Sequence, residues 1–177
     1  MRIPLLSGGR AKRASSADFP SHAARFLRFQ PTPKFRNPLP HPVRVAVVRV
    51  KLSGANLRVF QPSEGEAIQS FRPGILAGTL AALRRVSVPV PVTKAVVVFS
   101  DAKFPHIAPA ERDWLWQRFQ VPCFEQVLNS GRQVIAEECQ VHAGLHVLRP
   151  EQLSGMLCSV ECDCGRTEPR LLAPALR

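Results

Sequence analysis

The residues best suited to chemistry lie toward the carboxyl end of this 177-residue chain. Four of its five cysteines and two of its five histidines fall between positions 139 and 164. Thiolate and imidazole groups gathered in this way are the ligands that a tetrahedral zinc ion prefers. Gly165 directly follows the last of these cysteines and allows a tight turn whose backbone amides point at the sulfurs. The sequence therefore predicts a metal site in this segment.

The cysteine count favours metal ligands or free thiols over a disulfide framework. Five is an odd number, and no apolar segment of secretory-signal length follows Arg2, so we expect reduced thiols in a cytoplasmic protein. A second interpretation makes Cys139 a buried strand residue and leaves the later thiols unliganded, because Cys-x-Cys spacing is less typical of zinc sites than Cys-x-x-Cys. Cys123, in an apolar stretch, is expected to be a buried thiol and not a nucleophile.

The positive charge is concentrated near the amino terminus. The formal net charge is +11, but residues 1–50 hold ten lysines and arginines against one acid, whereas the rest of the chain holds fourteen against twelve. We therefore expect a disordered basic arm at 1–42, rich in arginine and proline, a single domain at 43–171 and a short tail at 172–177. The arm has three interpretations: a solvated leader from an over-long start, an organellar transit peptide, or a tail for nucleic acid or anionic surfaces. No apolar run reaches the roughly 20 residues of a membrane helix.

The domain that must position the metal ligands is predicted to have a mixed α/β fold. Short apolar or β-branched runs bounded by proline and glycine indicate strands, and helical spacing with a proline near its start indicates two helices. A helix between two strands implies a parallel pair with a crossover. We therefore expect a small, partly parallel sheet with crossover helices and a cysteine-rich C-terminal turn. The expected strands are 43–50, with 57–60 as its hairpin partner, 95–99, 121–128, 133–138 and 145–148, and the expected helices are 75–85 and 108–119.

A second candidate site follows the strand at 95–99. Ser100, Asp101 and Lys103 come after this strand, and α/β proteins bind ligands beyond the carboxyl ends of their parallel strands. Together with Glu125, they are the best candidates for the edge of a cofactor-binding pocket. An ordinary strand-to-helix loop is the alternative interpretation.

Four local motifs are typical of one known family. Their residues are Ile107-Ala-Pro-Ala-Glu-Arg112, Phe119-Gln-Val-Pro-Cys-Phe-Glu125, Glu138-Cys-Gln-Val-His-Ala-Gly-Leu-His146 and Cys162-Asp-Cys-Gly-Arg-Thr-Glu-Pro-Arg-Leu171. They are similar to the L-x-P-x-x-R, F-x-V-P-V-x-[DE], E-C-x-x-x-x-G-L-H and C-x-C-G-R-x-x-P-R-L motifs of the phenylacetate–coenzyme A ligase branch of the adenylate-forming enzymes. The resemblance covers roughly residues 74–171 and implies a fragment of that α/β fold.

The same resemblance selects among the cysteines and histidines. It implies that the end of one strand, the Gly-Leu-His turn and the Cys-x-Cys-Gly turn come together around one zinc ion. Cys158 or His142 could substitute for one ligand. With four ligands and no evident general base, the zinc is expected to be structural and not catalytic. The implied ligands are Cys139, His146, Cys162 and Cys164.

The groups that carry the family's chemistry have no recognisable counterpart. Residues 1–73 hold no Ser/Thr/Gly-rich phosphate loop, and Gln126-Val-Leu-Asn-Ser130 stands where the family has Tyr-Gly-x-Thr/Ser-Glu. The ribose-binding aspartate and the catalytic lysine are also missing, and adenylation needs such groups to hold Mg-ATP. We therefore expect a non-catalytic, zinc-stabilised α/β domain that acts as a binding or regulatory module.

Two other functions stay open. One is a split or residual acyl-CoA ligase piece that binds ATP, an acyl group or CoA, and the missing phosphate loop counts against it. The other is a zinc-containing nucleic-acid binder that uses the basic arm, and the near-neutral charge after residue 50 counts against that. A homo-oligomer or a partner protein is one way to cover open sheet edges, and the sequence leaves this open.

Overall fold

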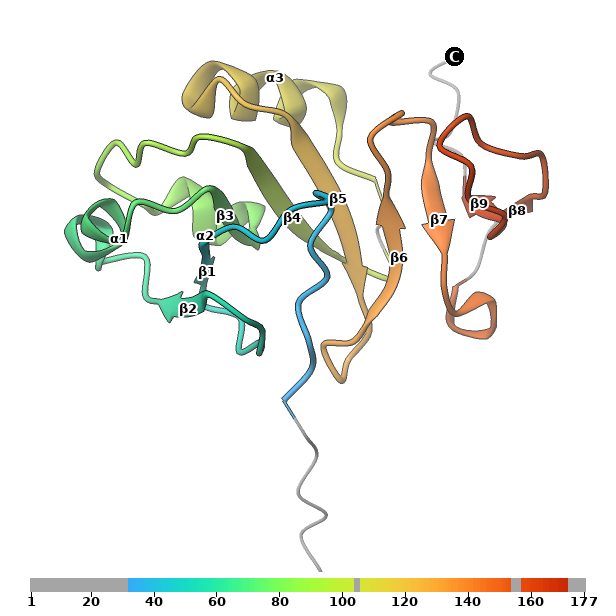
Figure 1. Cartoon of the computed structure of the whole chain (residues 1–177), viewed down its shortest axis with the longest axis horizontal. Coiled ribbons are helices and arrows are strands. Elements are labelled where there is room, and N and C mark those ends of the chain that lie inside the picture. Colours follow the sequence, from blue (N-terminus) through green and yellow to red (C-terminus); the bar gives the residue numbers. More distant parts are fainter. Residues whose placement is uncertain (1–31, 104–105, 154–156, 172–177) are drawn as a thin grey trace, which may run out of the picture. The chain divides into compact units, whose positions relative to one another are not determined.

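The structure, a computed structural model, describes residues 32–103, 106–153 and 157–171 (Figure 1). In these three segments the chain forms one nine-stranded sheet in the order β2-β1-β3-β4-β5-β6-β7-β9-β8, together with three α-helices and a 3-10 turn, η1. None of the described helices combines the length and the apolar character needed to cross a membrane. The elements are β1 (Val45–Val48), β2 (Leu57–Phe60), α1 (Gly65–Phe71), β3 (Ile75–Thr79), α2 (Leu80–Arg84), β4 (Ala95–Asp101), α3 (Pro109–Phe119), β5 (Cys123–Leu128), β6 (Val134–Glu138), β7 (Leu145–Val147), η1 (Pro150–Gln152), β8 (Leu157–Cys158) and β9 (Arg170–Leu171).

The sheet has two halves that differ in strand direction. β2, β1, β3, β4 and β5 run parallel to one another. β5, β6, β7, β9 and β8 pair in the antiparallel sense, so β5 belongs to both halves. This arrangement confirms the predicted α/β fold with a partly parallel sheet and a cysteine-rich C-terminal region.

Strands β1, β3 and β4 of the parallel half are buried on both faces, as their continuous apolar runs predict. On one face, Ile68 of α1, Leu83 of α2 and Leu115 of α3 pack with apolar residues of β1, β3 and β4. On the other face, Phe35, from the chain before β1, lies edge-on to Phe99 of β4 with ring centroids 6.4 Å apart. Most of the expected arm, at 1–31, lies outside the described residues, whereas its described part contributes to this second face.

The crossover predicted between the strands at 95–99 and 121–128 is present. β4 and β5 pair in parallel, and α3 connects them. α3 begins at Pro109, and the Glu111 carboxylate accepts a hydrogen bond from the backbone N–H of Ala108 at 3.1 Å. Proline at the first position and an accepted amide before it are what a helix start requires, since its first N–H groups have no partner inside the helix.

The helix predicted at 75–85 is only half correct. Its first part is strand β3, which lies between β1 and β4, and only α2 is helical. The first four residues of β3 are buried, so pairing on both sides outweighs the helical spacing of the apolar residues. Thr79 ends the strand and caps α2, because its side-chain oxygen accepts a hydrogen bond from the N–H of Ala82 at 3.3 Å.

The hairpin predicted for 57–60 is wrong, because β2 runs parallel to β1 with Val45 opposite Leu57. The chain returns to the start of β1 through residues 49–56. Ser53 in this loop exchanges backbone hydrogen bonds of 2.8 Å with Pro33 and Phe35. A contact with residues so far upstream leaves no mark on the local sequence pattern, and helix α1 was likewise not predicted.

The variant Leu115→Ala should lower the free energy of unfolding by about 2–5 kcal/mol, because the side chain is 1% exposed and its loss leaves a cavity under α3. Trp116→Ala on the same helix is the matched control. Its side chain is 54% exposed, so a change within about 0.5 kcal/mol is expected. Urea unfolding followed by circular dichroism measures both, and equal losses would contradict the packing of α3.

Candidate metal centre

Three segments of the antiparallel half carry the residues of the predicted metal site. Cys139 directly follows β6, and His146 is the middle residue of β7. β7 pairs with β6 on one side and with β9 on the other, so His146 lies between the other two segments. Cys162 and Cys164 lie in the turn that connects β8 to β9.

The cysteine turn is held in shape by two sets of hydrogen bonds. The N–H of Gly165 donates to the carbonyl of Cys162 at 2.8 Å, and the φ angle of Gly165 is +78°, a left-handed conformation that glycine adopts without strain. The Arg170 guanidinium donates to the carbonyl of Ala143 at 2.9 Å and to that of Val160 at 3.3 Å. The side chain of Arg170 therefore ties the chain before the turn to the loop between β6 and β7.

The four predicted ligand atoms lie within 4.8 Å of one another and could hold a metal ion. The sulfurs of Cys139 and Cys162 are 3.7 Å apart, and the Cys164 sulfur is 3.3 Å from Nε2 of His146. With Zn–S bonds of about 2.3 Å and Zn–N bonds of about 2.0 Å, a tetrahedral site separates two sulfurs by about 3.8 Å and a sulfur and a nitrogen by about 3.5 Å. The spacing and the donor set therefore fit zinc. All five cysteines are free thiols.

The two substitute ligands considered from the sequence, Cys158 and His142, are not among the clustered atoms of the described residues. His142 is engaged elsewhere: its Nδ1 lies 2.9 Å from a Glu138 carboxylate oxygen, and its ring stacks on Phe124 at 5.0 Å. Cys158 lies in β8, half-exposed.

Burial and neighbouring groups shift the pKa values of the clustered side chains. Burial raises the pKa of the Cys139 thiol to about 11. The pKa of Cys162 is lowered, chiefly by a hydrogen bond from the backbone of Cys164. The pKa of His146 is lowered, first by burial and then by the positive charge of Arg166, so the imidazole is neutral at pH 7, the state in which it binds a metal.

Arg166 joins the cysteine turn to β6. Its guanidinium donates to the Glu137 carboxylate at 2.8 Å and to Glu168 at 3.1 and 3.2 Å. Arg36, from the chain before β1, donates to both carboxylate oxygens of Glu137, at 2.7 and 2.9 Å. Three thiolates around a divalent ion would carry a residual negative charge, and Arg166 and Arg170 provide positive charge beside it.

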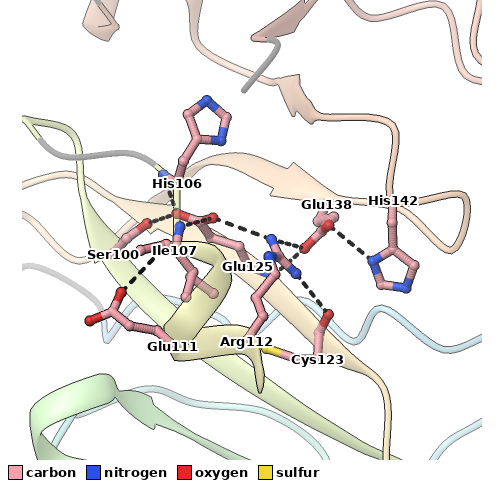
Figure 2. Close-up of polar contacts among 10 residues, drawn as sticks. Ser100, His106, Ile107, Glu111, Arg112, Cys123, Glu125, Glu138 and His142 are labelled. Carbon is pink, nitrogen blue, oxygen red and sulfur yellow. Dashed lines mark hydrogen bonds and ion pairs between the residues drawn. The ribbon is translucent and has the colours of Figure 1, made fainter. Parts of the chain in front are cut away.

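The second candidate site centres on Glu125, whose side chain is fully buried (Figure 2). Its carboxylate accepts a hydrogen bond from the Ser100 hydroxyl at 2.5 Å and from the backbone N–H groups of His106 and Ile107 at 2.7 and 2.9 Å. Asp101 accepts a hydrogen bond from the N–H of Lys103 at 2.8 Å. These four residues make local contacts that hold the loop before α3, and their role in binding a cofactor stays a prediction.

Arg112 of α3 connects this network to the strand that precedes Cys139 (Figure 2). It donates to Glu138 at 3.0 Å and lies 3.7 Å from the Glu125 carboxylate. Glu138 also accepts the backbone N–H of Glu125 at 3.0 Å. This role of Glu138 was not predicted from the sequence. The only sign of it in the sequence was a pair of adjacent glutamates, Glu137 and Glu138, in an otherwise apolar strand. Side chains of neighbouring strand residues must point to opposite faces of the sheet.

Comparisons with known proteins bear on the fold. No family model matches the chain, and no curated protein matches it. Among solved structures, it is similar to an open conformation of 2-hydroxyisobutyryl-CoA ligase in complex with 2-HIB-AMP and CoA, with a TM-score of 0.52 and 14% identity. The match covers 74% of this chain and 44% of that one, so this chain spans less than half of that ligase. At 14% identity the likeness shows a shared fold and nothing of the function.

The variant Glu125→Gln should lower the free energy of unfolding by about 1–3 kcal/mol, because the new amide places an NH₂ donor among donors that the carboxylate now accepts. Glu151→Gln, at an exposed position, should change the stability by no more than about 0.5 kcal/mol. Urea unfolding of both variants tests this expectation. A Glu125→Gln protein as stable as the parent would show that the network is not needed for folding.

Cys123 should react slowly with alkylating reagents, because burial raises the pKa of its thiol to about 12 and Arg112 only partly offsets this. Since the thiolate is the reactive form, its labelling rate in the folded protein should rise about tenfold per pH unit from pH 8 to pH 10. In urea, the labelling rate of the same thiol should level off above about pH 8.5. Timed iodoacetamide labelling, with the Cys123 peptide quantified by mass spectrometry, measures both slopes. A labelling rate that levels off near pH 9 in the folded protein would contradict the raised pKa of Cys123.

Proposed function

We propose that this chain is a zinc-stabilised α/β domain, related in fold to adenylate-forming ligases, that acts as a non-catalytic binding or regulatory module. The observation that carries the proposal is the placement of four ligand atoms, from three separate segments, within 4.8 Å of one another. The free state of all five cysteines agrees with a reducing compartment, and we place the protein in the cytoplasm.

A zinc ion at this position would link the end of β6, the middle of β7 and the turn before β9. Strands β8 and β9 have two residues each, and Leu171 is the one apolar residue among these four that is buried. Structural zinc sites contribute on the order of 10 kcal/mol to folding in small domains, enough to hold such strands in place. Four protein ligands complete a tetrahedron and leave no position for a substrate or a reactive water, which favours a structural over a catalytic ion.

The fold likeness to a CoA ligase favours one alternative, in which the chain is a residual or split ligase piece that binds ATP, an acyl group or CoA. The two candidates differ in what stabilises the protein. A ligand that binds the folded state raises the melting temperature, so ATP or CoA would do so only under the alternative. The nucleic-acid alternative depends on the basic arm, of which residues 1–31 lie outside the described part of the chain.

Elemental analysis of the purified chain should find about one zinc ion per molecule, because the four donors match a single tetrahedral site. Cys162→Ser and Cys164→Ser should both lose the ion and melt at a lower temperature than the parent. Cys158→Ser is the matched control, since Cys158 lies outside the cluster, and it should keep both the ion and the melting temperature.

Two results would contradict the proposal. A purified protein that contains no metal, and in which Cys162 and Cys164 react freely with thiol reagents, would remove the zinc site. If ATP or CoA raises the melting temperature of the zinc-loaded protein, the result would favour the residual ligase piece over the non-catalytic module.

A further inference from the structure

The four clustered ligand side chains are mostly buried but can be reached from the surface. Cys139 and Cys162 are buried, while Cys164 is partly exposed. A hollow of about 370 Å³ lies against the cluster, and its lining includes Cys139 and Cys164 together with the polar side chains of Glu137, Asp163 and Arg166. A polar hollow of this size admits water and small polar molecules. Two of the three clustered sulfurs therefore belong to residues that line a space open to small reagents.

The sulfurs of Cys139 and Cys162 are already in contact, 3.7 Å apart, without being bonded. A disulfide has an S–S length of about 2.05 Å, so bonding needs an approach of roughly 1.7 Å. Cys139 is fixed by its position directly after β6, whereas Cys162 lies in a turn between two strands of two residues each. Forming the bond therefore needs a shift of about this size between the end of β6 and the turn.

We propose that Cys139 and Cys162 form a peroxide-responsive dithiol, which hydrogen peroxide entering the hollow converts into a disulfide. The bond removes two of the four ligands, so a metal ion held by the cluster is released. The release rests on the proposed zinc site, whereas the oxidation itself needs only the two sulfurs.

The chemistry is a two-electron oxidation with peroxide as the oxidant. One thiolate attacks a peroxide oxygen and breaks the O–O bond, giving a sulfenic acid and a hydroxide that takes a proton to become water. The second thiolate attacks the sulfenic sulfur, forms the S–S bond and displaces a second hydroxide, which is also protonated. Two thiolates, one hydrogen peroxide and two protons thus give one disulfide and two waters.

The oxidised form would keep the cysteine turn attached to β6. The new bond joins the same two segments that a metal ion joins through Cys139 and Cys162. Arg166 remains paired with Glu137 across the same gap. Oxidation would therefore exchange a metal cross-link for a covalent one without unfolding the domain, and a thiol reductant would reverse the exchange.

The test uses the full chain in two forms, zinc-loaded and metal-free reduced, each treated with a small excess of hydrogen peroxide. A chromogenic chelator follows zinc release, and mass spectrometry identifies the bond after free thiols are blocked. Cleavage after glutamate places Cys139 in peptide 139–151, Cys158 in 152–161 and the last two cysteines in 162–168. Cleavage before Asp163 then separates Cys162 from Cys164.

We expect a Cys139–Cys162 disulfide in both forms, full zinc release from the loaded form, and reversal of both by dithiothreitol. The oxidised, metal-free protein should also melt at a higher temperature than the reduced, metal-free protein. Formation of a Cys139–Cys164 or Cys162–Cys164 bond instead, or oxidation to sulfinic acid without a disulfide, would overturn the proposal.

Matched variants separate the pair from its neighbours. Cys158→Ser and Cys164→Ser keep both sulfurs of the pair and should still form the disulfide in the metal-free state, whereas Cys139→Ser should not. If the purified protein holds no metal, the proposed function fails, but the metal-free arm still decides the dithiol. If zinc is present and peroxide leaves the two thiols reduced, the dithiol fails and the zinc site stands.

Discussion

Three carboxylates, those of Glu125, Glu137 and Glu138, lie in the interior of the sheet where its strands change from parallel to antiparallel. A buried carboxylate without a partner is costly, so each must meet a cation or several N–H donors. The partners come from the chain before β1, the loop before α3, α3 itself and the cysteine turn. Satisfying these charges therefore brings together parts of the chain that range from Arg36 to Arg166, and the clustered ligands begin at Cys139, directly after β6.

The cysteine turn is connected to β6 in two independent ways. Arg166 reaches Glu137 on one side, and Cys162 contacts Cys139 on the other. Glu137 pairs with Arg36 as well as with Arg166, so its carboxylate is held from two separate segments. These contacts partly set the position of the turn before any ion is bound. They therefore reduce the loss of conformational entropy that binding a metal ion would require.

The sequence predicted what depends on local pattern. The crossover from β4 through α3 to β5 follows from spacing and helix-start residues, and the four clustered ligands follow from motif resemblance. It did not predict β3, where burial on two sides outweighs helical spacing, or the parallel course of β2, which depends on a loop held by Ser53. The charge network was not predicted either. Arg36 and Glu137 are 101 positions apart, and no local pattern around one residue indicates that it pairs with the other.

The order of the segments along the chain has a consequence for biosynthesis. All strands of the parallel half lie before residue 129, whereas the four clustered ligands lie between residues 139 and 164. Because a ribosome delivers the amino-terminal part first, the valine-rich core can assemble while the last two cysteines are still inside the exit tunnel. If the proposed ion binds, its capture would be the closing event of folding, and a cell short of the ion would accumulate molecules that are folded through β6 and unfinished only at the carboxyl-terminal edge.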